Sequence, residues 1–274
     1  MKAKRIAIAC TVCACLVALA ACQQAPVTGR RQLILVTAAQ EAEMGEQGYA
    51  EVLRTSKLSD DAEMTGTLRR VGARIAAAAN RPDFQWEFNL IESDQVNAFA
   101  LPGGKVAFYT GILPICRNEA GVACVMGHEV AHVLARHGAE RVSQGVLVEA
   151  VGAGLAVALR SKDPAVRNGV LAAYGLGASV GVLLPYSRTH ESEADRIGIE
   201  LAARAGYDPA EAPALWDRMA ELGGSGTPEF FSFLSTHPNS ARRAAELRRV
   251  LPEMENIYRS APHQYGAGIV LKTK

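Results

Sequence analysis

The residues whose types and spacing suggest chemistry most directly are two histidines and a glutamate. His128, Glu129 and His132 form the pattern H-E-x-x-H within a segment of strongly helical composition. Histidines four residues apart lie on one face of a helix, so both imidazoles can reach a single ion. Neutral imidazole nitrogen is a preferred zinc ligand, and Glu129 lies where it can take a proton from water. We therefore predict a zinc site with Glu129 as the general base.

The alternative interpretation is a pair of surface histidines on an ordinary helix. Val125, Met126, Val130 and Leu134 surround the pair, so we expect the helix to be largely buried. Buried polar rings need partners, and a metal ion would supply one.

A catalytic zinc ion takes three protein ligands and leaves one position open, so a third ligand is needed. His137 follows His132 by five residues, which rotates it away from the ligand face. Glu191 and Asp195 are four residues apart in a second predicted helix, which places both carboxylates on one face. We predict that Glu191 is the third ligand and that Asp195 holds a ligand histidine or helps proton transfer. An ordinary charged helix face is the alternative.

Hydrophobic periodicity predicts an α+β fold that is mainly helical. Asn118 is the expected N-cap of the H-E-x-x-H helix, and Gly138 is its expected end. Pro252 is expected to end the last helix. The expected helices cover residues 38–56, 60–79, 119–137, 188–205, 228–234 and 240–250, and a further helix is expected to begin after Asp208 as its N-cap.

Three short strands are expected between these helices. Residues 84–90 alternate between apolar and polar types, which is typical of a half-buried strand. Residues 97–101 and 105–109 flank Pro102-Gly103-Gly104, so we predict a hairpin there.

The N-terminal residues are typical of a targeting segment. Lys2, Lys4 and Arg5 precede the uncharged stretch 6–21, which is short for a membrane span. The small residues directly before Cys22 resemble a bacterial lipobox, which implies cleavage before Cys22 and lipid attachment to it. An ordinary signal peptide with a chance cysteine is the alternative.

These features divide the chain into four predicted parts. We expect a lipoprotein signal peptide over 1–21, a lipidated tether over 22–37, a zinc metallopeptidase domain over 38–260 and a C-terminal tail over 261–274. Gln23, rather than the aspartate that usually retains lipoproteins at the inner membrane, favours the periplasmic face of the outer membrane.

The composition bounds the function further. The chain has 274 residues, of which 49% are hydrophobic and 21% are charged, and its net charge is +1. Such a chain can bury a full core, and it has no basic field of the kind that nucleic-acid binding requires. Whether Cys116 and Cys124 form a disulfide stays open. The uncharged residues 168–187 could form a buried helix, a lid over the site or a contact with the membrane. A third reading, an integral-membrane protease, would need the region 146–184 to span the membrane.

Several segments together resemble the HtpX/Oma/CAAX-prenyl-protease family of gluzincin metallopeptidases, and within it the periplasmic lipoprotein proteases. The resemblance covers about residues 27–252. The segments that carry it are 97–104, 110–113, 128–137, 187–188, Glu191, 194–198 and the His-Pro pattern at 237–242.

This resemblance implies a zincin-like fold with a small sheet beside the active-site helix. It implies one zinc ion on His128, His132 and Glu191, with Glu129 as the catalytic base. It assigns Asp195 a supporting or proton-donor role. It places His237 near the metal, where it either polarises the scissile carbonyl or caps the zinc in a resting state. From the sequence alone, His237 is equally a surface turn residue before a proline.

The implied reaction is hydrolysis of peptide bonds in unfolded or misassembled membrane and periplasmic proteins, with the outer-membrane assembly machinery as a candidate partner. We hypothesise that Asn97, Ala98 and Phe99 lie on a sheet edge where an extended substrate adds as a strand. The alternative function is a chaperone-like envelope lipoprotein with a structural zinc site.

Overall fold

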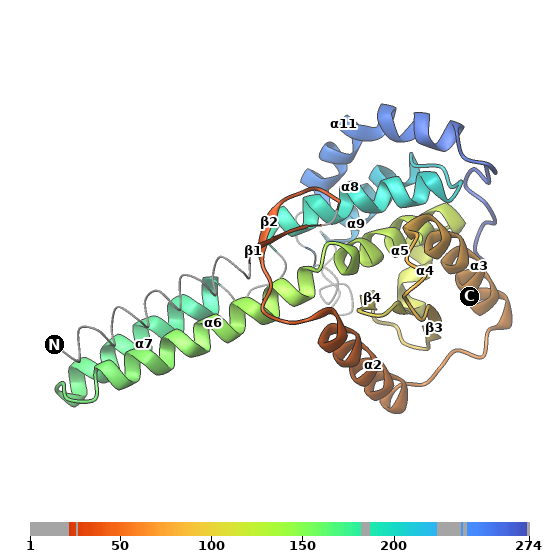
Figure 1. Ribbon diagram of the computed structural model, residues 1–274. Coiled ribbons are helices and arrows are strands. Elements are labelled where there is room, and N and C mark those ends of the chain that lie inside the picture. The colour runs from red at the N-terminus through yellow and green to blue at the C-terminus, as the bar shows by residue number, and fades with distance from the viewer. Residues whose placement is uncertain (1–21, 26, 182–186, 224–236, 238–239, 273–274) are drawn as a thin grey trace. The chain divides into compact units, whose positions relative to one another are not determined.

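A computed structural model describes residues 22–25, 27–181, 187–223, 237 and 240–272. The contacts divide the chain into two units, each described here by itself. One unit combines Met1–Ala38 with Arg136–Leu184, and the other combines Ala39–Ala135 with Pro185–Lys274 (Figure 1). The predicted signal peptide and the predicted helix over 228–234 lie outside the described residues.

The second unit contains a three-stranded sheet in the order β3-β5-β4. Strand β3 (Glu87–Ile91) pairs in parallel with β5 (Lys105–Tyr109), and β4 (Ala98–Leu101) pairs antiparallel with β5. The β4–β5 connection passes through Gly103 and Gly104, whose φ angles of 85° and 91° favour glycine. The predicted hairpin is confirmed, and β4 is an edge strand of this sheet.

Helices cover both faces of the sheet. Helix α2 (Ala38–Thr55) covers one face, where the Tyr49 hydroxyl donates a hydrogen bond of 2.8 Å to the Val106 carbonyl. Helix α3 (Ala62–Ala79) and helix α5 (Glu119–Leu134) share the main hydrophobic core with residues of the other face. A 3₁₀ turn (Thr110–Ile112) and a short helix, α4 (Leu113–Cys116), connect β5 to α5.

Helix α5 is buried at all but one of its positions, as expected for the H-E-x-x-H helix. The Asn118 side chain caps it by accepting a hydrogen bond from the Gly121 amide, as predicted. The helix ends at Leu134, however, and not at Gly138. Arg136 adopts a left-handed conformation (φ 60°) that separates α5 from the next helix, and Gly138 lies inside that next helix.

Three more helices lie among the described residues of this unit: α8 (Arg188–Arg204), α9 (Glu211–Gly223) and α11 (Ser240–Arg259). Helix α11 continues through Pro252, contrary to the prediction. Met254, beyond the proline, is fully buried, and this packing favours continuation of the helix. The fold is α+β and mainly helical, as predicted.

Helices α5 and α8 cross at a pair of glycines. A Cβ atom on Gly127 would lie 2.5 Å from the Gly198 carbonyl oxygen, and one on Gly198 would lie 2.6 Å from the His128 amide nitrogen. Only glycine permits backbones to approach this closely. The crossing brings the start of α8 towards the H-E-x-x-H residues.

The C-terminal residues contact the beginning of α5. The amides of Glu119 and Ala120 donate hydrogen bonds of 3.0 Å to the carbonyls of Ile269 and Ala267. These amides belong to the first turn of the helix, which has no intrahelical partners for them. The segment predicted as the C-terminal tail thus supplies hydrogen-bond acceptors to the first turn of α5.

The described part of the other unit forms a small hairpin and two long helices. Strand β1 (Cys22–Gln24) pairs antiparallel with β2 (Arg31–Leu33), within the segment predicted as a tether. Helix α6 (His137–Ala158) and helix α7 (Pro164–Gly181) are consecutive and lie side by side (Figure 1).

Candidate metal centre

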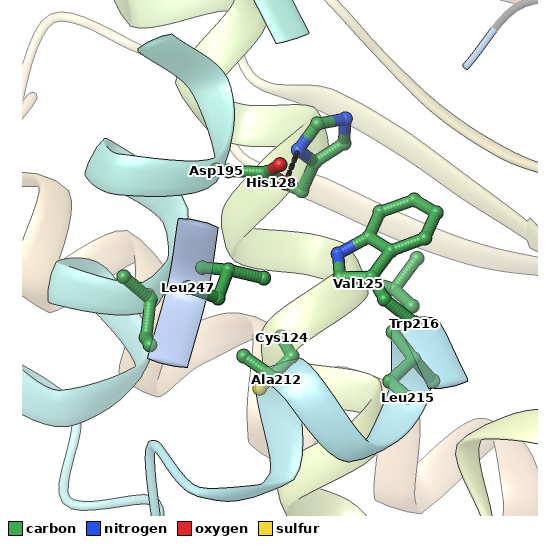
Figure 2. Close-up of a pocket in the computed structure, with 9 residues that line it drawn as sticks. Cys124, Val125, His128, Asp195, Ala212, Leu215, Trp216 and Leu247 are labelled. Atoms are coloured by element: carbon green, nitrogen blue, oxygen red, sulfur yellow. Dashed lines mark ion pairs between the residues drawn. The ribbon is translucent and has the colours of Figure 1, made fainter. Parts of the chain in front are cut away.

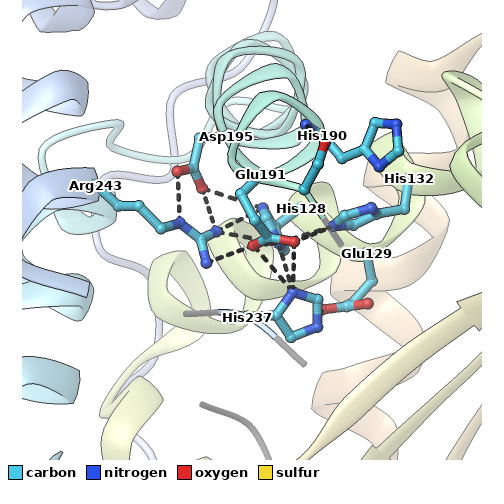
Figure 3. Close-up of polar contacts among 9 residues, drawn as sticks. His128, Glu129, His132, His190, Glu191, Asp195, His237 and Arg243 are labelled. Carbon is cyan, nitrogen blue, oxygen red and sulfur yellow. Dashed lines mark hydrogen bonds and ion pairs between the residues drawn. The ribbon is translucent and has the colours of Figure 1, made fainter. Parts of the chain in front are cut away.

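Four side chains from separate parts of the sequence converge on one point (Figure 3). His128 and His132 come from α5, Glu191 comes from the first turn of α8, and His237 precedes α11. All four side chains are buried, and one ligand atom from each lies within 4.8 Å of the others. The structure thus brings together the three predicted ligands and His237.

The separations between these atoms fit a tetrahedral zinc ion. The Nε2 atoms of His128 and His132 lie 3.1 Å apart, and the His128 Nε2 atom lies 3.3 Å from the His237 Nδ1 atom. The Glu191 carboxylate lies 3.5 Å from each of the first two nitrogens and 3.1 Å from the third. Ligand atoms about 2.1 Å from a tetrahedral ion are separated by about 3.4 Å.

The donor chemistry leads to the same conclusion. Three imidazole nitrogens directed at one point cannot all be satisfied by hydrogen bonds to one another, since each pair needs one donor and one acceptor. A cation at that point satisfies all three and also the carboxylate. Nitrogen and carboxylate donors in this number are typical of zinc. The residues present therefore fit a zinc ion.

Glu129 lies beside the ligand cluster and is not part of it. It is 4% exposed, and its Oε1 atom has no hydrogen-bond partner among the described residues. This atom lies 3.5 Å from the His237 Nε2 atom. Burial raises the pKa of Glu129, and His237 and His128 lower it only in part. A buried carboxylate with a free oxygen and a raised pKa is suited to accepting a proton.

Asp195 contacts the far side of a predicted ligand. Its Oδ1 atom lies 3.1 Å from the His128 Nδ1 atom. A carboxylate in this position fixes the ring so that the Nε2 atom faces the ion. Burial acts to raise the pKa of Asp195, but the Arg243 guanidinium and His128 outweigh it and hold that pKa below its usual range. Of the two roles left open by the sequence, this geometry favours support of the ligand over proton donation.

Arg243 is a site residue that sequence reasoning missed. Its Nε and Nη2 atoms lie 2.7 and 2.6 Å from the two Asp195 oxygens, which makes a bidentate pair. Its Nη1 atom lies 2.7 Å from a Glu191 oxygen, and its guanidinium stacks 3.5 Å above the Trp216 ring. One buried cation therefore holds both carboxylates of α8.

The spacing of residues in α11 could have indicated that Arg243 is buried. Arg243, Leu247 and Met254 recur at positions i, i+4 and i+11 of α11, and all three are buried. Arg243 therefore shares the apolar face of an amphipathic helix. Its neighbour Arg242, which the family resemblance includes, is exposed and pairs with Glu246.

Comparisons with known proteins identify the family. The model of the family described as "Peptidase family M48" matches residues 62–251, which include every residue of the cluster. The chain belongs to peptidase family M48. M48 metallopeptidases use zinc, so zinc is the metal, and a zinc metalloendopeptidase is confirmed at the level of the family.

Relatives of this M48 chain occur in eukaryotes and in bacteria. It is 37% identical to the mitochondrial metalloendopeptidase OMA1 of Schizosaccharomyces pombe, over 84% of this chain and 66% of that protein. It is 32% identical to OMA1 of Saccharomyces cerevisiae, over 86% of this chain and 70% of that protein. It is 30% identical to the beta-barrel assembly-enhancing protease of Escherichia coli, over 78% of this chain and 44% of that protein. The match thus spans about two thirds of the length of the fungal relatives and less than half of the bacterial one.

A small pocket lies behind the ligand histidine of this M48 site (Figure 2). His128 and Asp195 form its polar part, and the remaining lining is mostly apolar. The other lining residues are Cys124, Val125, Ile199, Ala212, Leu215, Trp216 and Leu247. These apolar walls keep the His128–Asp195 contact in a medium of low polarity, which strengthens it.

The two cysteines left open in the sequence, Cys116 and Cys124, are both buried free thiols, so no disulfide joins them. Cys124 lines the small pocket behind His128. Burial raises the pKa of Cys116 to about 12 and raises that of Cys124 as well. Both cysteines are neutral packing residues at physiological pH.

The predicted substrate-binding residues lie at the beginning of β4. Ala98 is buried in the main core, whereas Phe99 packs on the opposite face of the sheet against Tyr49 and Tyr109. The Phe99 side chain is therefore not directed towards α5. The Asn97 carbonyl accepts a hydrogen bond of 3.0 Å from the Tyr109 amide.

This bond fixes which backbone groups of β4 face outward. Hydrogen-bonded and non-hydrogen-bonded pairs alternate in an antiparallel ladder. Since Asn97 is bonded to β5, Phe99 is bonded to β5 as well, and Ala98 and Ala100 direct their amides and carbonyls away from it. Ala100 thus provides an outward amide and carbonyl at the sheet edge, whereas the Ala98 amide donates a hydrogen bond of 3.0 Å to the Asn97 side-chain oxygen and Ala98 is buried.

Proposed function

We propose that this M48 chain is a zinc endopeptidase of the bacterial cell envelope that hydrolyses peptide bonds in unfolded or misassembled outer-membrane and periplasmic proteins. The observation that carries the proposal is the convergence of His128, His132 and Glu191 beside the buried, available carboxylate of Glu129. A bound zinc ion supplies Lewis-acid polarisation of the scissile carbonyl and makes water more acidic.

The chain's own residues divide the remaining work. Glu129 takes a proton from the attacking water at its Oε1 atom and passes it to the leaving amine nitrogen. Asp195 keeps the His128 ring in the orientation that the ion needs, and Arg243 holds Asp195.

The direct test replaces Glu129 by Gln in the purified protein. This change keeps size and hydrogen bonding but removes the basic oxygen. We expect zinc content like that of the wild type and a fall in casein hydrolysis of about 100-fold or more. Cleavage at the wild-type rate would reject the assignment of the base.

An extended substrate is proposed to bind along β4. The edge position of β4 and the outward amide and carbonyl of Ala100 support this proposal, since an added strand would use those groups. Backbone recognition requires an unfolded or flexible segment and tolerates many side chains. The proposed substrates therefore share exposure of the chain, not a sequence motif.

Ala100→Pro tests this mode, because it removes an outward amide and keeps the bonds of Phe99 to β5. We expect peptide cleavage to fall and zinc content to stay unchanged. Phe99→Pro is less informative, since it would break the β4–β5 ladder itself. Ala100→Val serves as the control, because it keeps the amide. Equal losses in both variants would contradict strand addition.

Location is the next part of the proposal. The lipobox-like residues before Cys22 support a lipid anchor at the periplasmic face of the outer membrane. The name of the Escherichia coli relative, a beta-barrel assembly-enhancing protease, supports a link to outer-membrane assembly. Labelled fatty acid should enter the wild type and not a Cys22→Ala variant; incorporation by the variant would remove the anchor from the proposal.

A second candidate function follows from His237. With His237, the site offers four protein donors, and four protein ligands are typical of a structural zinc ion. A chaperone-like lipoprotein with structural zinc would need this donor. A peptidase needs it to leave, so that water and substrate can approach.

His237→Ala separates the two functions. For a peptidase whose resting state is capped by His237, three ligands remain, so zinc is retained and cleavage of casein is equal or faster. For a structural site, the variant loses zinc and stability together. Zinc content by atomic absorption and the melting temperature decide between these outcomes.

A further inference from the structure

Helix α6 exposes an apolar face that nothing in the proposed function uses. The exposed residues of its second half are all uncharged and nonpolar except Glu149. They recur at i, i+4 and i+7 spacings, so they form a continuous stripe over about three turns. The residues of the stripe are Val146, Leu147, Ala150, Val151, Ala153, Gly154, Val157 and Ala158.

The stripe exposes large apolar side chains to solvent. Val146, Val151 and Val157 are 49%, 49% and 63% exposed. Val166 and Val170 on α7 are also exposed, at 55% and 39%. Contiguous exposed apolar surface of this kind marks a binding site for another apolar surface.

Length and composition point to a lipid bilayer as that surface. Among the described residues, α6 is the one helix long and apolar enough to cross a membrane. Core helices and signal sequences also meet this criterion, but only 6% of the apolar window is buried, and α6 begins at residue 137.

The charges at the end of the hairpin fit a phospholipid surface. Arg160 and Lys162 lie in the turn between α6 and α7, and Arg167 lies in the first turn of α7. Asp163 is the one acid in this stretch, and it accepts hydrogen bonds from the Ala165 and Val166 amides. The end of the hairpin is therefore basic, which favours contact with anionic lipid phosphates.

The other end of α6 is attached to the N-terminal hairpin in the same unit. Arg30 pairs with Glu140 at 2.7 Å, and the Leu35 amide donates a hydrogen bond of 2.8 Å to the Ser143 hydroxyl. Because β1 begins at Cys22, an acyl group on Cys22 would hold this end of α6 at a membrane.

We infer that the α6–α7 hairpin binds a lipid bilayer through this apolar stripe, with Arg160 and Lys162 at the phosphates. The contact is a second membrane attachment, separate from any acyl group on Cys22. It does not depend on peptidase activity, so it can fail while the proposed function holds.

The test uses the protein without residues 1–21 and with Cys22→Ser, so that no acyl group contributes. Vesicles of phosphatidylcholine, with or without phosphatidylglycerol, are floated on a density gradient. We expect the protein to float with the vesicles, and more completely when phosphatidylglycerol is present. Protein that stays at the bottom with both vesicle types would overturn the inference.

Variants locate the contact. Val146→Asp, Val151→Asp and Val157→Asp together should abolish flotation and leave casein hydrolysis unchanged, since these side chains are exposed and outside the active site. Met44→Asp, at a 48% exposed position on α2, is the matched control and should float like the parent. Equal flotation of the triple variant would overturn the assignment to the stripe.

Two further outcomes distinguish the sources of binding. Arg160→Glu with Lys162→Glu should weaken flotation with phosphatidylglycerol and change it little without. If the parent protein does not float but elutes as a dimer, and the triple variant elutes as a monomer, the stripe binds a second copy and the lipid inference is wrong.

Discussion

Helices α5 and α6 are consecutive, and both are rich in Ala, Val and Gly, yet α5 is almost entirely buried and α6 is largely exposed. In α5, three polar residues interrupt the apolar pattern at one face, and each takes part in the metal centre. In α6, the apolar stripe carries no such residues. The comparison shows that apolar composition alone does not distinguish a core helix from a helix whose apolar face is exposed.

The largest effect is expected when the Glu191 carboxylate, which α8 places beside α5, is removed. Glu191→Ala should lower zinc affinity by more than the 10- to 100-fold typical of losing an outer partner, and casein hydrolysis should disappear. Metal content after dialysis measures this. Glu200→Ala, on the surface of the same helix and paired with Arg204, is the control and should keep its zinc. Retention of zinc by the Glu191 variant would mean that the third ligand lies elsewhere.

Matched glycine substitutions compare the two helices directly. Gly198→Ala places a methyl group 2.6 Å from the His128 amide nitrogen, so it should destabilise the protein by about 1–3 kcal/mol and reduce zinc affinity. Gly154→Ala, in α6, meets nothing within 4 Å and should be neutral or stabilising by up to about 1 kcal/mol. Urea unfolding of both variants measures the contrast. Similar effects at the two positions would contradict the close crossing of α5 and α8.

Arg243→Lys is a subtler change in the same centre. Lysine keeps the charge but cannot form the bidentate pair with Asp195 or stack on Trp216 in the same way. We expect about a 10- to 100-fold fall in zinc affinity or kcat, with the fold retained. Arg242→Lys, at the neighbouring exposed position, should leave both quantities unchanged. If the two lysine variants behave alike, Arg243 has no positioning role.

The smallest expected effect is a pH dependence of zinc loading. Burial and the Arg243 charge lower the pKa of His128, but hydrogen bonds to Asp195 and Glu191 outweigh them and raise it to about 9 in the ion-free protein. Below that pH a proton occupies the ring and competes with zinc, so apparent zinc affinity should rise with pH up to about 9. Asp195→Asn should move this limit towards the usual histidine range. A plateau already reached near pH 7 in the wild type would contradict the raised pKa.

Much of the site could be predicted from the sequence, because its geometry is local. Residues at i and i+4 share a helix face whatever surrounds them, so His128 with His132, and Glu191 with Asp195, follow from spacing alone. The pairing of these two helices was predicted because a catalytic zinc ion needs a third protein ligand, and the family resemblance implied the same pairing. Arg243 was missed, because a charged residue in an Arg-rich segment is expected to be solvated, and only its register with Leu247 and Met254 suggests otherwise.

The fold was predictable where local signals dominate and not where packing overrides them. The Asn118 cap and the Gly103-Gly104 hairpin follow from short-range chemistry. The ends of α5 and α11 do not. Arg136, a residue with no strong preference for a left-handed backbone, ends α5, and Pro252 fails to end α11 because its later turns are packed in the core.

The contact of Gly127 with Gly198 has a consequence for how this centre tolerates change. The distance from the His128 and His132 rings to the Glu191 carboxylate is set where the backbones of α5 and α8 touch. It therefore does not depend on the volume of the surrounding side chains. Core residues elsewhere along both helices can be exchanged for others of similar volume without altering that distance. A shorter acid at position 191 would fall short by one methylene, because neither backbone can move closer to compensate.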